Sequence, residues 1–176
     1  ACASTRQTPE RLLLSLGAWP HALALHKGRF LATHFPRGTS FAPVTLPPVG
    51  QDLPLAQVDA YSVDDSTTTE IDDALSVQGL GSGTVTLGIH IAAPGLAVLP
   101  GSAIDLLGRA RLSTVYMPGY KLTMLPDEVV QSYTLQEGRN CPALSLYVTL
   151  DESSLAINQS VTRLEMVPIA CNLRHD

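Results

Sequence analysis

Five acidic side chains lie within ten residues of the stretch DDSTTTEIDDAL, which runs from residue 64 to residue 75. No lysine or arginine lies between Arg37 and Arg109, so no base close in sequence can neutralise these acids. Mg²⁺ is bound through carboxylate oxygens, water and substrate phosphates. The stretch therefore predicts a site for a hard divalent ion. Its acids are Asp64, Asp65, Glu70, Asp72 and Asp73.

The plainest alternative is a solvated acidic turn, in which Asp and Thr side chains satisfy the backbone. Against it, Asp72 and Asp73 stand between apolar Ile71 and Ala74, where burial and mutual repulsion penalise their charge unless a cation compensates. A calcium-binding EF-hand is excluded, because the sixth residue counted from Asp64 is not Gly and the twelfth is not Glu. An aspartic protease is excluded because D-T-G and D-S-G are absent.

The composition is that of a globular protein with one main domain: 176 residues, 45% hydrophobic and 15% charged, with a net charge of -5. Three cysteines without a C-x-x-C pair indicate neither a zinc site nor a disulfide framework. The N-terminus does not read as a secretory signal, and no apolar run approaches the roughly 20 residues of a membrane span. We expect a cytoplasmic protein without a membrane partner.

The elements that must position the acids begin after an N-terminal segment. Residues 1–40 are expected to form a small helical module of winged-helix type. Its first helix is predicted at Thr8, a good N-cap, with Pro9 at the first helical position. Residues 41–57 are rich in proline and are predicted to be a linker.

After residue 58 the pattern alternates as strands do. One face of the segment TVTLGIHIA carries its large apolar residues, Val85, Leu87, Ile89 and Ile91. The turn GSG at 81–83 separates this strand from the preceding run ALSVQGL, which predicts a hairpin. His90 lies on the opposite face, and we interpret it as a hydrogen-bonded strand residue, with a ligand role as the alternative.

Two helices and two further strands are predicted downstream. Ser102 followed by Asp105 is a capping-box pattern, and Pro126 opens a second helical stretch. The last segment, from residue 143 to residue 167, reads as two strands joined by a polar turn. The predicted fold class is α+β, mixed α and β with antiparallel strand pairs. The acids then lie on a loop that enters a sheet, where functional sites are commonly built.

Four blocks of this sequence carry a resemblance: YSVDDSTTTEIDDALSV, LGIHIAAPG, PGSAIDLLGRARLSTVYMPGYKLTMLPDEV and CPALSLYVTL. In order and spacing they are similar to the catalytic domain of the ribonuclease II family, the RNB domain. The family's signature D-x5-D-x-D-D-A is matched by Asp64, Glu70, Asp72, Asp73 and Ala74. On this resemblance, residues 58–176 form the N-terminal part of an RNB catalytic domain.

The resemblance implies a 3′→5′ exoribonuclease that hydrolyses single-stranded RNA to nucleoside 5′-monophosphates. It also implies two divalent ions, Mg²⁺ or Mn²⁺. By the same resemblance Asp64 and Asp73 are metal ligands, while Asp72 helps to hold the second ion and orients the attacking water. Glu70 completes the catalytic cluster. Tyr116 matches the family's tyrosine that stacks on the 3′-terminal base, with a core aromatic as the alternative.

Two positions depart from the family pattern. Glu70 stands where Asp is usual, and Ala93 replaces the acid of the family's HIAD. These departures favour an alternative, an RNB-like module that binds RNA and is weakened or inactive as a nuclease. A structural domain with merely exposed acids is a third interpretation. The expected partners are single-stranded RNA, the remaining part of the RNB domain and an S1-type domain, because the chain is shorter than a whole RNB domain.

Overall fold

The computed structural model describes residues 8–50 and 52–175, and the chain divides after Ala42 into two compact units. The first unit contains α1 (Pro9–Ser15) and α2 (Ala22–His34). Thr8 caps α1 with its side chain, as predicted. Arg29 of α2 and Glu10 of α1 form an ion pair at 2.7 Å. The described part of this unit has no strand, and the winged-helix type stays a prediction.

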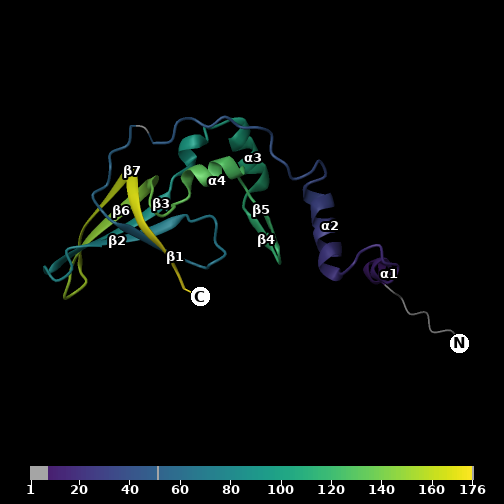
Figure 1. The fold of residues 1–176 in the computed structure, drawn as a ribbon, viewed down its shortest axis with the longest axis horizontal. Helices are drawn as coiled ribbons and strands as arrows, with labels where there is room; N and C mark the ends of the chain where they lie inside the picture. The colour runs from purple at the N-terminus through teal and green to yellow at the C-terminus, as the bar shows by residue number, and fades with distance from the viewer. Residues whose placement is uncertain (1–7, 51, 176) are drawn as a thin grey trace. The chain divides into compact units, whose positions relative to one another are not determined.

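The second unit is built on a five-stranded closed barrel (Figure 1). Its strands are β1 (Ala60–Asp64), β2 (Asp73–Gln78), β3 (Thr84–Ala92), β6 (Asn140–Asp151) and β7 (Ile157–Arg174). Neighbouring strands in the order β1-β2-β3-β6-β7 are antiparallel, which confirms the predicted α+β class and the hairpin around residues 81–83.

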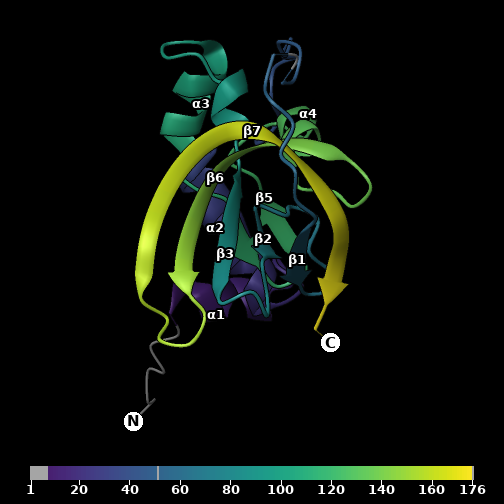
Figure 2. The ribbon, with the colours of Figure 1, turned by 90° about the vertical axis from the view of Figure 1, so that its left-hand side faces the viewer.

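A parallel pair closes the barrel. β1 runs alongside the C-terminal half of β7, from the pairing of Ala60 with Ile169 to that of Asp64 with Arg174. Figure 2 shows the strong curvature of β6 and β7 that brings the end of β7 round to β1. The side chain of Asn172 on β7 donates hydrogen bonds to the Ser62 hydroxyl and to the Leu135 carbonyl, both at 2.9 Å. The sequence patterns did not predict this closure.

The inside of the barrel combines an apolar cluster with a buried polar network. His90 is fully buried there, with Nε2 2.9 Å from the Ser76 hydroxyl and Nδ1 2.8 Å from the Ser145 hydroxyl. The Tyr147 hydroxyl donates to the buried Glu165 carboxylate at 2.6 Å. The interpretation of His90 as a hydrogen-bonded strand residue is confirmed. On the predicted apolar face, Leu87, Ile89 and Ile91 are exposed on the outside of the barrel, whereas Val85 is buried.

An insertion between β3 and β6 forms a second, smaller core at one end of the barrel (Figure 1). Its elements are η1 (Pro94–Ala97), α3 (Ala103–Arg111), β4 (Val115–Met117), β5 (Tyr120–Leu122) and α4 (Asp127–Tyr133). Ser102 caps α3 by accepting from the Asp105 backbone N–H at 3.2 Å, which confirms the capping prediction.

The proline-rich segment contributes to this second core. Val44, Leu46 and Val49 pack against a buried cluster formed by Ala97, Ile104, Val129 and Tyr133. Part of the segment expected to be a linker therefore belongs to the second unit. The division of the chain into functional domains stays a prediction. No helix among the described residues has the length and apolar character needed to cross a membrane.

Candidate active site at the rim of the barrel

The acidic stretch is the connection between β1 and β2 at one rim of the barrel. Asp64 is the last residue of β1, and Asp73 is the first residue of β2. The loop between them is short enough to keep its acids near the two strand ends, which the pairing of Tyr61 with Leu75 holds together. The predicted location of the acids, on a loop that enters a sheet, is confirmed.

Ile71 anchors the second half of this loop. Its side chain is buried in the barrel core, and its backbone N–H donates to the Thr134 hydroxyl at 2.8 Å. The backbone N–H of Leu135 donates to the Ile71 carbonyl at 2.8 Å, and that of Ala92 donates to the Asp72 carbonyl at 2.9 Å. The backbone on either side of the catalytic candidate Asp72 is therefore held from two directions.

The first half of the loop is held by the C-terminal end of β7. Arg174 donates from its guanidinium to the Asp65 carbonyl at 2.8 Å, and the backbone N–H of His175 donates to the Asp64 carbonyl at 3.3 Å. The His175 ring lies 2.9 Å from the Asp65 carboxylate. Asp65, which the family signature does not include, is thus paired with a group from the far end of the chain.

Asp64 carries the clearest sign of an incomplete site. Its Oδ2 atom is buried and has no hydrogen-bond partner in the part of the chain that the structure describes. A buried acceptor without a partner is costly, and native proteins rarely leave one unsatisfied. The oxygen is therefore suited to a partner that supplies positive charge.

Asp72 and Asp73 both reach solvent, which corrects the expectation that their apolar neighbours bury them. Partial burial still raises the pKa of Asp72, and repulsion from Asp73, Glu70 and Asp64 raises this pKa further, while a backbone hydrogen bond opposes the change. The acids of the family signature are therefore close enough to influence one another. Their accumulated negative charge is what a bound cation would relieve.

The donor set fits a hard cation by its chemistry, since it offers carboxylate oxygens and one of them is orphaned. The geometry is less complete. Among the described residues, no group of three or more His, Cys, Asp or Glu side chains is arranged to hold a metal ion. The ligand roles of Asp64, Asp72 and Asp73 stay predictions.

Glu70 has partners that the sequence interpretation missed. The ammonium group of Lys121 on β5 lies 3.2 Å from Glu70 Oε1, so a base that is distant in sequence pairs with one of the acids. The hydroxyl of Tyr116 on β4 donates to Glu70 Oε2 at 3.4 Å. Tyr116 and Lys121 face each other across the β4–β5 hairpin. The Pro-Gly turn in YMPGYKL was the local signal that could have placed Lys121 beside Tyr116.

Tyr116 is 72% exposed, so the alternative of a core aromatic is wrong. Loss of water around the phenol raises its pKa, and the neighbouring Glu70 charge acts in the same direction. The hydroxyl therefore stays protonated and can donate to Glu70. The exposed side chain is accessible to another molecule, and its stacking on a base stays a prediction.

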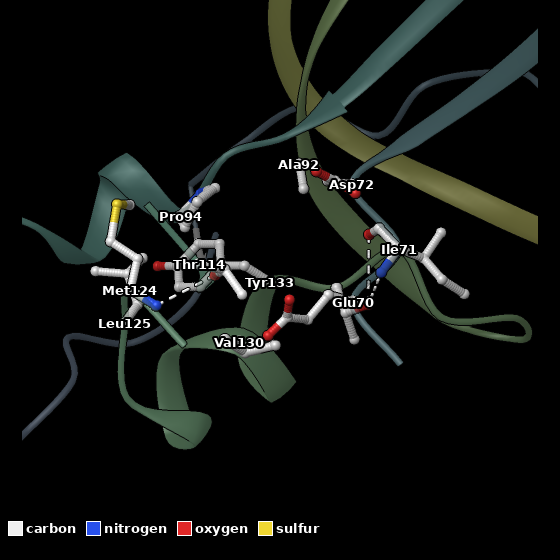
Figure 3. Close-up of a pocket in the computed structure, with 11 residues that line it drawn as sticks. Glu70, Ile71, Asp72, Ala92, Pro94, Thr114, Met124, Leu125, Val130 and Tyr133 are labelled. Atoms are coloured by element: carbon white, nitrogen blue, oxygen red, sulfur yellow. Dashed lines mark hydrogen bonds between the residues drawn. The ribbon is translucent and has the colours of Figure 1, made fainter. Parts of the chain in front are cut away.

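Two hollows flank Glu70. One is an apolar cleft of about 140 Å³ with Glu70 and Asp72 among its lining residues. Figure 3 shows these two acids on one side of the cleft, with Pro94 and Met124 on the other. The second hollow, of about 690 Å³, is lined by the acidic loop and the β4–β5 hairpin, including Tyr116. Glu70 thus lies between an apolar cleft and a groove of mixed polarity.

The described region matches a known family. Residues 53–164 match the model of the RNB domain. The chain is 36% identical over 155 residues to an uncharacterized ribonuclease of Synechocystis sp., which covers 81% of this chain and 23% of that protein. It is 30% identical over 158 residues to the chloroplastic/mitochondrial ribonuclease II of Arabidopsis thaliana, covering 85% of this chain and 20% of the relative.

A solved structure is also similar to this chain. Yeast Ssd1, described as a pseudonuclease, superposes with a TM-score of 0.65 and 25% identity over 73% of this chain and 17% of that one. The chain spans about a fifth of the length of the two ribonucleases that it matches. The matched residues include the barrel strands β1 to β6, the acidic loop and the β4–β5 hairpin. The chain therefore belongs to the RNB domain family.

Proposed function

We propose that residues 43–176 carry the acidic part of the active site of a 3′→5′ exoribonuclease, which hydrolyses single-stranded RNA to nucleoside 5′-monophosphates. The observation that carries this proposal is the buried oxygen of Asp64, which has no partner among the described residues and belongs to a set of acids whose charges act on Asp72. An acidic turn with a purely structural role has no reason to leave that oxygen unsatisfied. The names of the two ribonuclease relatives support the same activity.

Exoribonucleases of this family are generally dependent on a divalent metal. In this proposal Asp64, Asp73 and Asp72 hold Mg²⁺ or Mn²⁺. The bound ions would neutralise charge on the phosphodiester and make water a better nucleophile. Asp72 orients the attacking water, and its fixed backbone suits that positioning role. Glu70 completes the cluster and is itself held by Lys121 and Tyr116.

The groove beside Glu70 is the proposed path of the RNA 3′ end. It combines an exposed aromatic ring, Tyr116, with the hydroxyls of Thr67, Thr68 and Thr69 and the ammonium of Lys121. Aromatic stacking suits any base, because every base has a π-face. The net charge of -5 does not supply a basic track for a long strand. We propose that an S1-type domain supplies the basic surface for the rest of the RNA strand. We also propose that the reaction takes place in the cytoplasm.

Calorimetric titration of Mn²⁺ into the chain tests the proposed metal site. We expect saturable binding that Asp64→Asn weakens. Asp59→Asn is the matched control, because Asp59 is an exposed acid outside the signature. Heats of dilution alone, or equal weakening by both substitutions, would refute a metal site in the acidic loop.

A second candidate function is RNA binding without cleavage. It is favoured by Lys121, whose ammonium occupies the cation position beside Glu70, and by the likeness to a pseudonuclease. Ala93 adds to it, since this chain has no carboxylate at that position. Release of adenosine 5′-monophosphate from poly(A) by a protein that carries the whole RNB region separates the two functions. RNA binding that is retained without release of the monophosphate would support the second function, RNA binding without cleavage.

A further inference from the structure

The barrel has a second hollow, of about 590 Å³, that is separate from the acidic site. It is lined by the segment 54–58 and by residues of β2, β3, β6 and β7, and we call it the side pocket. Asp73 begins β2, whereas Gln78, which lines the pocket, ends that strand roughly 16 Å farther along. The polar residues of its lining are Gln57, Gln78, Thr86, Tyr147, Thr149, Gln159, Arg163 and Glu165.

The side pocket opens where one edge of β7 is left uncovered. β1 pairs with β7 only from Ile169 onward, and a single bridge joins Leu55 to Met166 ahead of that point. Before this bridge, no strand of the described residues lies on that edge of β7. The pocket therefore gives access from outside to the polar network within the barrel.

Glu165 is the group that points to a ligand. It lines the pocket although it is only 2% exposed. The Tyr147 hydroxyl donates to its Oε1 atom at 2.6 Å, and burial together with this hydrogen bond raises the pKa of Tyr147 to about 12, so the hydroxyl keeps its proton. None of the ion pairs among the described residues includes Glu165. A carboxylate buried this deeply normally has more partners, and it can accept further hydrogen bonds.

Arg163 brings the opposite chemistry to the same pocket. Its side chain is exposed, and its guanidinium carbon lies 5.5 Å from the centre of the Tyr147 ring. Arg163 and Glu165 are two residues apart on β7, so they share one side of the strand at a spacing of roughly 7 Å. The pocket thus combines a buried acceptor, a planar fork of donors and an aromatic ring.

We propose that the side pocket binds a guanine base. Guanine presents two acceptors, O6 and N7, on the edge that arginine contacts most often. On another edge it carries N–H donors at N1 and N2, which a carboxylate can accept. Adenine and cytosine lack this combination of two neighbouring acceptors and two neighbouring donors. The flat base also suits stacking on the Tyr147 ring or on the Arg163 guanidinium.

An amino acid is the other small ligand with matching charges, since it carries an ammonium and a carboxylate. Both of its charges would lose their water, and contacts in a buried site often only balance that cost. A neutral base gives Glu165 charge-assisted hydrogen bonds without a second buried charge. The apolar part of the lining, which includes Leu55, Val58 and Val161, also matches the faces of a base.

Calorimetric titration of guanosine 5′-monophosphate into the chain tests the proposal. EDTA is present, so that no divalent ion holds the phosphate at the acidic loop. We expect saturable binding at one site. Inosine 5′-monophosphate lacks the amino group at N2 and should bind roughly tenfold more weakly. Adenosine 5′-monophosphate should bind roughly five- to a hundredfold more weakly, because it cannot satisfy both Arg163 and Glu165.

Two substitutions locate the bound base. Arg163→Met should weaken guanosine monophosphate binding by roughly tenfold, and Arg109→Met, at an exposed arginine on α3, should leave it unchanged. Glu165→Gln should reduce the difference between the guanosine and inosine nucleotides, because the amide accepts with one oxygen only. Thermal melting of each variant confirms that it is folded at the temperature of the titration.

A second titration distinguishes the two sources of a guanine base. If the pocket takes guanosine within RNA, the pentanucleotide UUGUU binds more tightly than UUUUU, and Arg163→Met removes the difference. If it takes only the free nucleotide, the two pentanucleotides bind alike while guanosine monophosphate still binds.

Several results would overturn the proposal. Equal affinity for the guanosine and adenosine nucleotides would leave only unspecific stacking, and unchanged binding in Arg163→Met would put the base elsewhere. Displacement of the nucleotide by millimolar glycine would assign the pocket to zwitterions, and absence of saturable binding would remove the site. These readouts need neither Mn²⁺ nor RNA cleavage, so they stand or fall separately from the proposed nuclease function.

Discussion

The inside of the barrel and its acidic rim both contain buried polar groups, but these groups differ in how fully they are hydrogen-bonded. Inside, His90 is satisfied on both ring nitrogens, and Glu165 accepts a hydrogen bond from Tyr147. At the rim, Asp64 keeps a buried oxygen that has no partner among the described residues, and partial burial together with the neighbouring acids raises the pKa of Asp72. A satisfied polar network stabilises one fold. A cluster left unsatisfied points to a ligand that the chain itself does not supply.

The largest expected effect contrasts one acid from each region. In a protein that carries the whole RNB region, Asp72→Asn should lower turnover by roughly 10²- to 10⁴-fold, the range for loss of a group that positions or deprotonates the nucleophile. RNA binding should be retained. The measurement is release of nucleotide monophosphate from poly(A), alongside binding to the same RNA.

Glu165→Gln is the matched carboxylate-to-amide control for this prediction. It alters the buried partner of Tyr147 and should cost about 1 to 3 kcal/mol of unfolding free energy. Turnover of the folded fraction should be nearly unchanged. Equal losses of turnover in both variants would remove the distinction between a functional rim and a structural interior.

The next effect concerns the exposed ring beside the rim. Tyr116→Ala should weaken the grip on the RNA end by about 1 to 3 kcal/mol, which is the value of stacking on one base. Early steps on a long strand should keep their rate, and the final product should change in length, because the short fragments dissociate sooner. Gel analysis of labelled poly(A) measures this. Tyr61→Ala on the outside of β1, also an exposed tyrosine, should leave the product length unaltered.

A smaller effect is expected from pH on the interior. Burial lowers the pKa of His90, and the Glu165 charge opposes this change. Below a pH of about 6.5, His90 is protonated in the unfolded chain but stays neutral in the folded chain. The stability of the fold therefore decreases as the pH drops. The thermal midpoint should decrease by on the order of a few degrees between pH 7.5 and pH 5. In His90→Gln this decrease should be smaller. An identical decrease would show that His90 does not cause the loss of stability at low pH.

The smallest expected effect concerns the ion pair between Lys121 and Glu70. Lys121→Met removes a partly exposed ion pair with Glu70 and should change stability by no more than about 1 kcal/mol. It should strengthen Mn²⁺ binding by roughly two- to fivefold, because the ammonium no longer competes at the rim. Arg109→Met, which breaks the ion pair with Asp105 on α3, is the control. Weaker Mn²⁺ binding in Lys121→Met would mean that Lys121 organises the site.

Local signals predicted the elements well. Thr8 and Ser102 cap their helices, and the GSG turn joins β2 to β3, because caps and tight turns depend on a few neighbouring residues. The acids were also found from sequence, since their type and spacing are themselves local. Their roles came from the family resemblance.

Features that depend on distant residues were not predicted. The pairing of Lys121 with Glu70 joins positions about fifty residues apart, and the closure of β1 against β7 joins positions more than a hundred apart. Alternation in TVTLGIHIA correctly separated His90 from Ile89, but periodicity cannot say which side of a sheet becomes the interior. Here the side of His90 is the interior, where Ser76 on β2 and Ser145 on β6 are its hydrogen-bond partners.

The parallel closure of β1 on β7 also sets an order of assembly. The β2–β3 and β6–β7 hairpins join neighbouring segments and can form early, whereas β1 must wait for residues at the far end of the chain. Closing so long a loop costs entropy before any contact rewards it, so pairs of this kind form late. On a ribosome, Asp64 reaches its final position only after Arg174 has emerged. The surroundings of Asp64 are therefore completed late in folding.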